Sequence, residues 1–237
     1  MERHDSAPSF AQLTFGWAVH FYTAFGAVLG FLALWAAFQQ DYTEVFWLLA
    51  VALLIDATDG TFARRARVKQ VVPWINGEML DNIVDYLTYV VVPVAIFVQP
   101  GILPNGTQSL ALLVLLASCY GFSRTDAKGF VEHYFQGFPS YWNVVAFYYV
   151  ILETHPAFNL ALLMVFVALV FVPMRWLYPS RMERFRAQAL ILGAVWAVMG
   201  LILIWQMPEP SKALGWISLF YPIYYTVMSV RYHFSSE

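Results

Sequence analysis

Long apolar runs separated by short polar stretches restrict the fold of this chain more than any other feature. A helix needs about 20 apolar residues to cross the roughly 30 Å hydrocarbon core of a bilayer. Eight segments approach that length, at residues 15–38, 44–65, 77–99, 107–126, 140–153, 157–178, 187–206 and 213–231. Because lipid cannot satisfy backbone polar groups, we expect an all-α, polytopic bundle of about eight transmembrane helices.

The composition agrees with a membrane protein. The chain is 60% hydrophobic and only 12% charged, whereas soluble domains are about 25% charged. This balance excludes a soluble globular domain, a disordered chain and a nucleic-acid binder with a basic surface. The single cysteine, Cys119, excludes a disulfide framework and is expected to be a buried apolar residue. Short loops leave no domain boundary, so residues 1–237 are expected to form one membrane-embedded domain.

The basic residues predict the orientation of the helices. If the 66–76 loop is placed in the cytoplasm, twelve of the 13 Lys and Arg residues fall on that side, which is a strong positive-inside signal. Only Lys212 falls on the opposite side. An even number of helices then leaves both termini in the cytoplasm. A single span over 140–178 would invert the basic cluster at 179–186, and Pro156 also favours a break there. The twelve are Arg3, Arg64, Arg65, Arg67, Lys69, Arg124, Lys128, Arg175, Arg181, Arg184, Arg186 and Arg231.

Four aspartates stand within the second and third apolar segments. Asp56 and Asp59 share one helix face at i, i+3, and Asp81 and Asp85 share one at i, i+4. The short intervening loop makes the two helices antiparallel neighbours, so the four carboxylates are expected to face each other near the cytoplasmic end. Carboxylates are costly in membrane helices and usually mark function. Ordinary interfacial salt bridges would not explain an aspartate that follows the apolar run 45–55.

Four carboxylates cannot all ionise in a low-dielectric site without compensation. Oxygen ligands favour hard cations, so Mg²⁺ or Mn²⁺ is expected, with Ca²⁺ as a competitor. Two carboxylate pairs suit two ions or one shared ion, which would bind phosphate oxygens. Gly60 and Ala63 continue the first acidic face with almost no side chain, and Gly77 begins the second. Arg64 adds a guanidinium group for phosphate.

These residues form a known pattern, Asp56-x-x-Asp59-Gly60-x-x-Ala63-Arg64 followed by Gly77-x-x-x-Asp81-x-x-x-Asp85. It resembles the signature of the CDP-alcohol phosphatidyltransferases at every fixed position. The spacer of twelve residues between its two halves is longer than in most of that family. The long spacer, the eight predicted helices and the stretches 120–128 and 137–143 are similar to the bacterial phosphatidylcholine synthase subfamily. The resemblance is carried by much of residues 50–145.

The resemblance implies a reaction, a location and roles for the signature residues. CDP-diacylglycerol and choline would give phosphatidylcholine and CMP at the bacterial inner membrane, with the active site near the cytoplasmic face. The first three aspartates would hold Mn²⁺ or Mg²⁺, with two ions expected. Asp85 would be the base that deprotonates choline and a further metal ligand. Gly60, Ala63, Arg64 and Gly77 would contact the nucleotide and its diphosphate. The family also suggests a homodimer.

Choline offers no N–H donor, so aromatic faces, with or without a carboxylate, are the expected ligands of its ammonium group. Tyr89, four residues after Asp85, and Glu78, seven before it, are the first candidates. Many membrane aromatics serve as interface anchors or in packing instead. The complete set of candidates is Glu78, Tyr86, Tyr89, Tyr120, Tyr141 and Trp142.

Other readings stay open at this point. The same reaction could use serine, inositol phosphate or glycerol phosphate as the acceptor. A metal-ion or solute transporter would also place carboxylates in membrane helices, although nearer the middle of the bilayer. A purely structural membrane protein would leave the aspartates unexplained. His20, in the first segment, is expected to be a hydrogen-bonded packing residue or, alternatively, a residue near the site.

Overall fold

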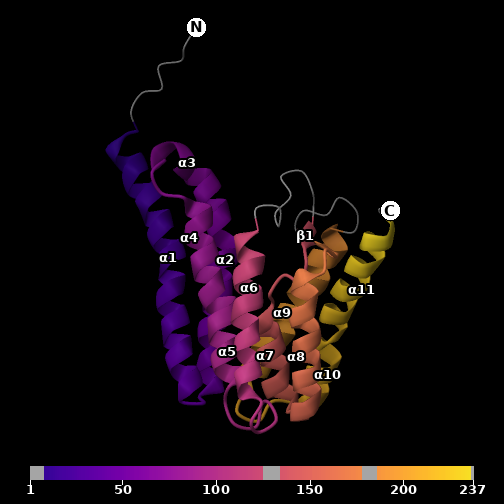
Figure 1. Cartoon of the computed structure of the whole chain (residues 1–237). Helices are drawn as coiled ribbons and strands as arrows, with labels where there is room; N and C mark the ends of the chain where they lie inside the picture. The colour runs from indigo at the N-terminus through magenta and orange to yellow at the C-terminus, as the bar shows by residue number, and fades with distance from the viewer. Residues whose placement is uncertain (1–7, 125–133, 178–185, 236–237) are drawn as a thin grey trace.

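The computed structural model describes residues 8–124, 134–177 and 186–235 as a bundle of helices (Figure 1). The α-helices are α1 (Phe10–Phe38), α2 (Tyr42–Ala66), α3 (Val68–Val71), α4 (Gly77–Asp85), α5 (Val92–Phe97), α6 (Leu112–Ser123), α7 (Trp142–Leu152), α8 (Pro156–Phe171), α9 (Arg186–Trp205), α10 (Lys212–Ser218) and α11 (Phe220–Ser235). A π-helix, η1 (Tyr86–Val91), joins α4 to α5, and a 3₁₀-helix, η2 (Gln108–Ala111), precedes α6.

Each of the eight predicted segments contains an apolar helix. Five helices in the described residues are long and apolar enough to cross a membrane, namely Phe10–Phe38, Tyr42–Ala66, Gly77–Phe97, Arg186–Trp205 and Lys212–Phe234. Three further apolar helices are shorter, namely Gln108–Ser123, Trp142–Leu152 and Pro156–Phe171. The fold is therefore that of a polytopic helical membrane protein, as the sequence predicts.

A short antiparallel ribbon departs from the all-α expectation. Strand β1 (Tyr134–Gln136) pairs with β2 (Arg175–Leu177), with Gln136 opposite Arg175. The predicted sixth helix, 157–178, is too long, because α8 ends at Phe171 and the chain then becomes extended to form β2. Apolar residues continue through this region, so hydropathy alone does not reveal the end of the helix.

Local sequence signals fix several helix boundaries. Ser9 and Gln12 form a capping box, and this starts α1 at Phe10. The predicted break within 140–178 is confirmed, because Glu153 has a left-handed backbone after α7 and Pro156 begins α8. Arg67 likewise adopts a left-handed conformation at the end of α2. The chain then turns through α3 so that α4 can run back beside α2 (Figure 1).

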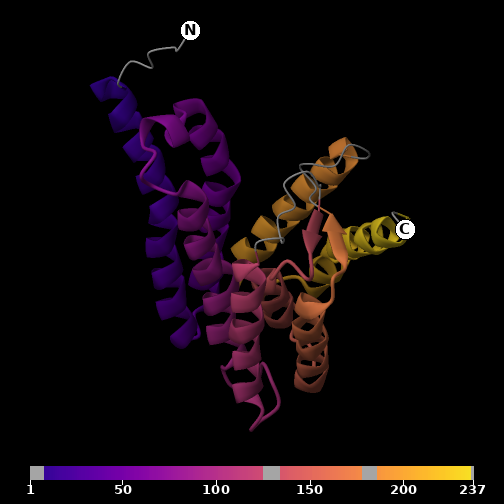
Figure 2. The same ribbon diagram turned by 45° about the horizontal axis from the view of Figure 1, so that its top comes forward.

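Glycines on α1 allow this helix to pack closely along α4 and η1. A Cβ atom at Gly26 would lie 2.6 Å from Val84 Cγ1, and one at Gly30 would lie 2.7 Å from a methyl group of Leu87. Gly26 and Gly30 are four residues apart, which is the small-residue spacing of close membrane helix pairs. Figure 2 shows α1, α2 and α4 on one side of the molecule and the C-terminal helices on the other.

The ends of the bundle differ in charge. The C-terminal ends of α2, α6 and α11 and the N-terminal ends of α4 and α9 lie at the same end as the start of α1 (Figure 1). Eight of the predicted cytoplasmic basic residues lie on or directly next to these elements, on α3 or in β2, namely Arg64, Arg65, Arg67, Lys69, Arg124, Arg175, Arg186 and Arg231. Lys212 lies at the opposite end, paired with Glu153. Arg3, Lys128, Arg181 and Arg184 lie outside the described residues.

Candidate active site

Three carboxylates meet between α2 and α4. One oxygen from each of Asp56, Asp81 and Asp85 lies within 4.8 Å of the others, and all three side chains are partly buried. Asp56 comes from α2, whereas Asp81 and Asp85 lie one turn apart on α4. The side chain of Asn76 caps the first turn of α4 by accepting a hydrogen bond from the Met79 backbone N–H at 3.1 Å. This cap fixes where the helix begins and hence which face carries the aspartates.

The fourth predicted carboxylate, Asp59, does not belong to this three-carboxylate group. It is buried, and its Oδ2 accepts a hydrogen bond from Thr23 Oγ1 on α1 at 2.8 Å. The other carboxylate oxygen of Asp59 remains available to a ligand. The sequence does not indicate Thr23, because nothing in the pattern of α2 and α4 shows which side chain of α1 faces them.

Tyr89 is bound to the acidic group by its hydroxyl. The Tyr89 hydroxyl donates to Asp56 Oδ2 at 2.8 Å, and Asp85 also interacts electrostatically with it. Tyr89 lies in the π-helix η1, which begins directly after Asp85 and includes a wide hydrogen bond from the Val92 N–H to the Leu87 carbonyl. Pro93 has no N–H to donate to Tyr89, so an ordinary α-helical ladder cannot continue there. Pro93 is the sequence signal that could have indicated this irregular turn.

The residues predicted to contact a nucleotide lie toward the basic end of the same two helices. Gly60 follows Asp59 on α2, and Arg64 Nη1 lies 3.3 Å from the position that a Cβ at Gly60 would take. The guanidinium group also donates to Thr61 at 3.0 Å. Ala63 packs against the small apolar cluster around Val19. The helix face between Asp59 and Arg64 thus carries the small residues Gly60 and Ala63, with the exposed Arg64 guanidinium group beside Gly60.

Three candidate choline ligands are engaged elsewhere. Trp142 is fully buried, and its indole N–H donates to Ser118 Oγ at 2.8 Å. Tyr86 turns toward α6, where its hydroxyl donates to the Leu115 carbonyl at 2.9 Å. Tyr120 lies on α6 with its ring 5.1 Å from that of Phe171. These three side chains therefore face away from the carboxylate group or lie within packing contacts.

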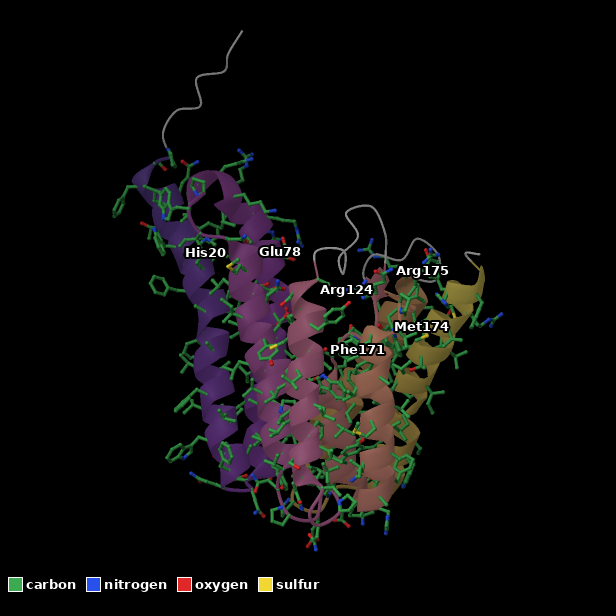
Figure 3. The ribbon with its side chains drawn as sticks, in the orientation of Figure 1. His20, Glu78, Arg124, Phe171, Met174 and Arg175 are labelled. Carbon is green, nitrogen blue, oxygen red and sulfur yellow. The ribbon has the colours of Figure 1, made fainter. Side chains whose placement is uncertain are left out.

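Three tyrosines form an aromatic row that begins at the carboxylates. The ring centroid of Tyr89 lies 6.5 Å from that of Tyr141, which lies 6.0 Å from that of Tyr225 on α11. Tyr225 also donates to the Leu177 carbonyl at 3.0 Å. The sequence analysis did not select Tyr225, because it is far from the signature in sequence. Glu78, the other candidate, is exposed in the first turn of α4 (Figure 3).

One further expectation is wrong, and another is met only in part. Cys119 is exposed rather than buried, and its thiol lies 3.1 Å from the Tyr86 hydroxyl. It faces outward because α6 presents this side to a groove beside α4, lined in part by Met79 and Ile83. His20 is buried as a packing residue would be, but its Nε2 has no hydrogen-bond partner among the described residues.

Fold and site together define the class of this protein as a polytopic helical membrane protein with a three-carboxylate site between two of its helices.

Comparison with known proteins narrows the class. No family model matches the chain. A phosphatidylcholine synthase of Legionella pneumophila is 36% identical over 233 residues, 91% of each chain. The phosphatidylcholine synthase of Pseudomonas aeruginosa is 40% identical over 84% of this chain and 83% of its own. The one from Mesorhizobium japonicum is 36% identical over 80% and 70%. The chain belongs to the phosphatidylcholine synthase family.

Proposed function

We propose that this chain is a phosphatidylcholine synthase that transfers the phosphatidyl group of CDP-diacylglycerol to choline, with CMP as the second product. The meeting of Asp56, Asp81 and Asp85 within 4.8 Å carries the proposal. Relatives of that name, which match most of the chain, support it. A transporter would not need the small-residue face and Arg64 beside the carboxylates. We therefore favour an enzyme over an ion path.

The donor set fits a divalent cation. Three carboxylates within mutual reach offer only hard oxygen ligands, which suit Mg²⁺ or Mn²⁺. Such an ion supplies charge neutralisation to phosphate oxygens. We propose that Asp56, Asp81 and Asp85 hold the first ion. The oxygen of Asp59 that does not bind Thr23 would be available to a second ion.

The chemical step requires a base for the acceptor alcohol. We assign this role to Asp85, the carboxylate of α4 that lies farther from the start of the helix. It takes the hydroxyl proton of choline while the choline oxygen forms a bond to the phosphatidyl phosphorus. The bond between that phosphorus and the CMP oxygen breaks, and its electron pair leaves with CMP. The charge on the leaving phosphate faces the Arg64 side of the site.

The nucleotide is proposed to lie on the face formed by Gly60, Ala63 and Gly77. Small side chains allow a flat ligand to approach the backbone, and a bulkier residue at Gly60 would displace the Arg64 guanidinium group. Arg64 is exposed and rests on Thr61 by one hydrogen bond. It can therefore turn to the diphosphate at little cost, since exposed polar contacts are weak.

Choline is proposed to bind beside Asp85 against the tyrosine row Tyr89, Tyr141 and Tyr225. Its ammonium group lies only two carbons from the reacting oxygen, so its ligands must be close to the base. Tyrosine faces attract such cations by about 0.5–2 kcal/mol each. Glu78, Tyr86, Tyr120 and Trp142 are less suitable, because they are exposed, turned to α6 or enclosed in the core.

The proposed location is the bacterial inner membrane, with the basic end of the bundle in the cytoplasm. Bacterial relatives and multiple apolar helices support a bacterial membrane. The gathering of the basic residues at one end supports the orientation. Cytidine nucleotides are cytoplasmic substrates, so the active site would be open on that side. The homodimer that the resemblance suggests stays a prediction.

One assay tests the function and the acceptor together. Purified protein is incubated with CDP-diacylglycerol and Mn²⁺, and CMP release is measured separately with choline, serine, inositol phosphate and glycerol phosphate. Release with choline alone is expected, and EDTA should abolish it. If CMP is released only with another acceptor, that acceptor would replace choline as the proposed substrate. Full activity in EDTA would contradict the metal site.

The Asp85→Asn variant tests the assignment of the base. Turnover should fall by at least about 100-fold, the effect typical of a lost general base. Affinity for CMP in the presence of Mg²⁺ should fall much less than in Asp81→Asn, because Asp56 and Asp81 still offer ligands for the ion. A loss of CMP binding as large as that caused by Asp81→Asn would instead make Asp85 chiefly a metal ligand.

A further inference from the structure

Thr23 connects helix α1 to the acidic face of α2. Its Oγ1 donates a hydrogen bond to Asp59 Oδ2 at 2.8 Å, and both residues are buried. A hydroxyl that donates to an ionised carboxylate forms a stronger bond than one that donates to a neutral acceptor. Thr23 thus brings α1 into direct contact with one of the four signature carboxylates.

The hydroxyl of Thr23 differs from other threonine hydroxyls of this chain in the acceptor that it uses. Thr14 and Thr226 donate to the carbonyl four residues earlier in their own helices, at 2.9 and 2.8 Å. The corresponding distance from Thr23 to the Val19 carbonyl is 3.3 Å, whereas Asp59 Oδ2 lies at 2.8 Å. Because a threonine hydroxyl has a single proton, the shorter contact with the charged acceptor is the bond that it makes.

Close packing of α1 fixes where this hydroxyl lies. One turn after Thr23, a Cβ atom at Gly26 would lie 2.6 Å from Val84 Cγ1 of α4. Directly before Thr23, the Tyr22 hydroxyl shares a hydrogen bond of 2.8 Å with Thr58 Oγ1 of α2. Figures 1 and 2 show α1 running beside both of these helices. Since a β-branched side chain also has few rotamers in a helix, the fold sets the position of the Thr23 hydroxyl relative to α2.

The bond from Thr23 determines which oxygen of Asp59 can serve a ligand. A carboxylate turns readily about its last side-chain torsion, which has only broad preferences. The Thr23 hydroxyl holds Oδ2 and leaves Oδ1 for another partner. Hydrogen-bonding partners of this kind orient metal ligands, and their loss typically weakens metal binding by about 10- to 100-fold.

We propose that Thr23 is a positioning residue that orients the Asp59 carboxylate for the second divalent cation. This inference rests on the proposed function and adds a residue of α1 to it. The three carboxylates assigned to the first ion form a separate group, which does not include Asp59. Loss of the Thr23 hydroxyl should therefore weaken the second ion and spare the first.

A Mn²⁺ titration tests this role without turnover. Free Mn²⁺ is followed by electron paramagnetic resonance in the presence of purified protein, which is expected to bind two ions. Asp59→Asn identifies the affinity that depends on this carboxylate. Thr23→Val, which removes the hydroxyl and keeps the branched shape, should weaken that affinity by about 10- to 100-fold and change the other by less than about twofold. Thr23→Ser, which keeps the hydroxyl, should retain most of the affinity.

Tyr22→Phe is the matched control. It removes a hydroxyl from the neighbouring position of α1, but this hydroxyl is bonded to Thr58 and not to a carboxylate. Both Mn²⁺ affinities should stay unchanged in this variant. If Thr23→Val does not fold, Thr23→Ser and Thr23→Ala give the same comparison, with tight binding of the second ion expected only for Thr23→Ser.

The outcomes separate this inference from the proposed function. Unchanged binding of the second ion by Thr23→Val would overturn the inference and leave the proposed function intact. Equal weakening of both ions, or an equal loss in Tyr22→Phe, would show that Thr23 acts through the general packing of α1 and would also overturn it. Binding of fewer than two ions by the unaltered protein would instead contradict the two-ion site of the proposed function.

Discussion

Two candidate membrane spans differ in how much of them is buried in the protein. One is Gly77–Phe97, which contains α4, and the other is α9. In the most apolar stretch of Gly77–Phe97 half of the residues are buried in the protein, compared with 17% in Arg186–Trp205. The first span carries Asp81 and Asp85, whereas α9 carries no acidic residue at all. The buried residues of the first span lie mainly in η1 and α5, whereas α4 buries only Val84 and carries its carboxylates partly buried beside Asp56 of α2. Helix α9 instead turns large apolar side chains outward.

The largest expected effect is loss of a ligand from the three-carboxylate group of Asp56, Asp81 and Asp85. Asp56→Asn or Asp81→Asn should reduce turnover by at least about 100-fold, which exceeds the 10- to 100-fold typical of residues behind metal ligands. Mn²⁺ binding should weaken in parallel, as measured by titration of the purified protein. Asp41→Asn is the control, because Asp41 only caps α2 and asparagine caps equally well. Similar losses in all three variants would refute a specific acidic site.

A smaller effect is expected from the Tyr89 hydroxyl. Tyr89→Phe removes the hydrogen bond to Asp56, and Mn²⁺ affinity should fall by about 10- to 100-fold, as for other residues that orient metal ligands. Tyr86→Phe is the control. It removes a hydroxyl from the same helix, but this hydroxyl donates to the Leu115 backbone carbonyl and not to a carboxylate, so the Mn²⁺ affinity should not change. Unchanged affinity in Tyr89→Phe would mean that only the ring matters.

Tyr225, in the C-terminal half of the chain, tests whether the tyrosine row contributes to choline binding. Tyr225→Leu should raise the choline KM by about 2- to 30-fold, the range of a single cation–π contact, with little change in the CDP-diacylglycerol KM. Tyr225→Phe keeps the ring and should be milder. Phe234→Leu, at an exposed position of the same helix, is the control. Equal increases for both substrates in Tyr225→Leu would indicate a packing role.

The smallest effect on activity is expected within α9. Leu203 is fully buried and Ile202 is 43% exposed, although they are neighbours in sequence. Leu203→Ala should destabilise the protein by about 2–5 kcal/mol, whereas Ile202→Ala should change stability by less than about 0.5 kcal/mol. Thermal unfolding in detergent measures both, and turnover below the transition should stay normal. A large loss from Ile202→Ala would place a partner on this outward face.

Much of the fold follows from hydropathy, because span length and helix-breaking residues are local properties. Eight apolar helices, the break before Pro156 and the pairing of α2 with α4 were all predictable. The end of α8 at Phe171 was not predictable, because the residues that follow it into β2 are also mostly apolar and hydropathy does not distinguish a strand from a helix. The π-helix after Asp85 was also missed, although Pro93 was a usable signal.

The sequence by itself determined which residues we propose for the chemistry. Spacing of three and four residues on two adjacent helices puts Asp56, Asp59, Asp81 and Asp85 on facing stripes, and that geometry is a property of the α-helix. Only the tertiary structure decided which of them meet and what holds them. Asp59 lies outside the group of the other three and accepts a hydrogen bond from Thr23, and the hydroxyl of Tyr89 binds Asp56. These contacts join residues more than thirty positions apart. They depend on how far each helix is rotated about its axis when it packs, and sequence periodicity does not predict that rotation to within a fraction of a turn.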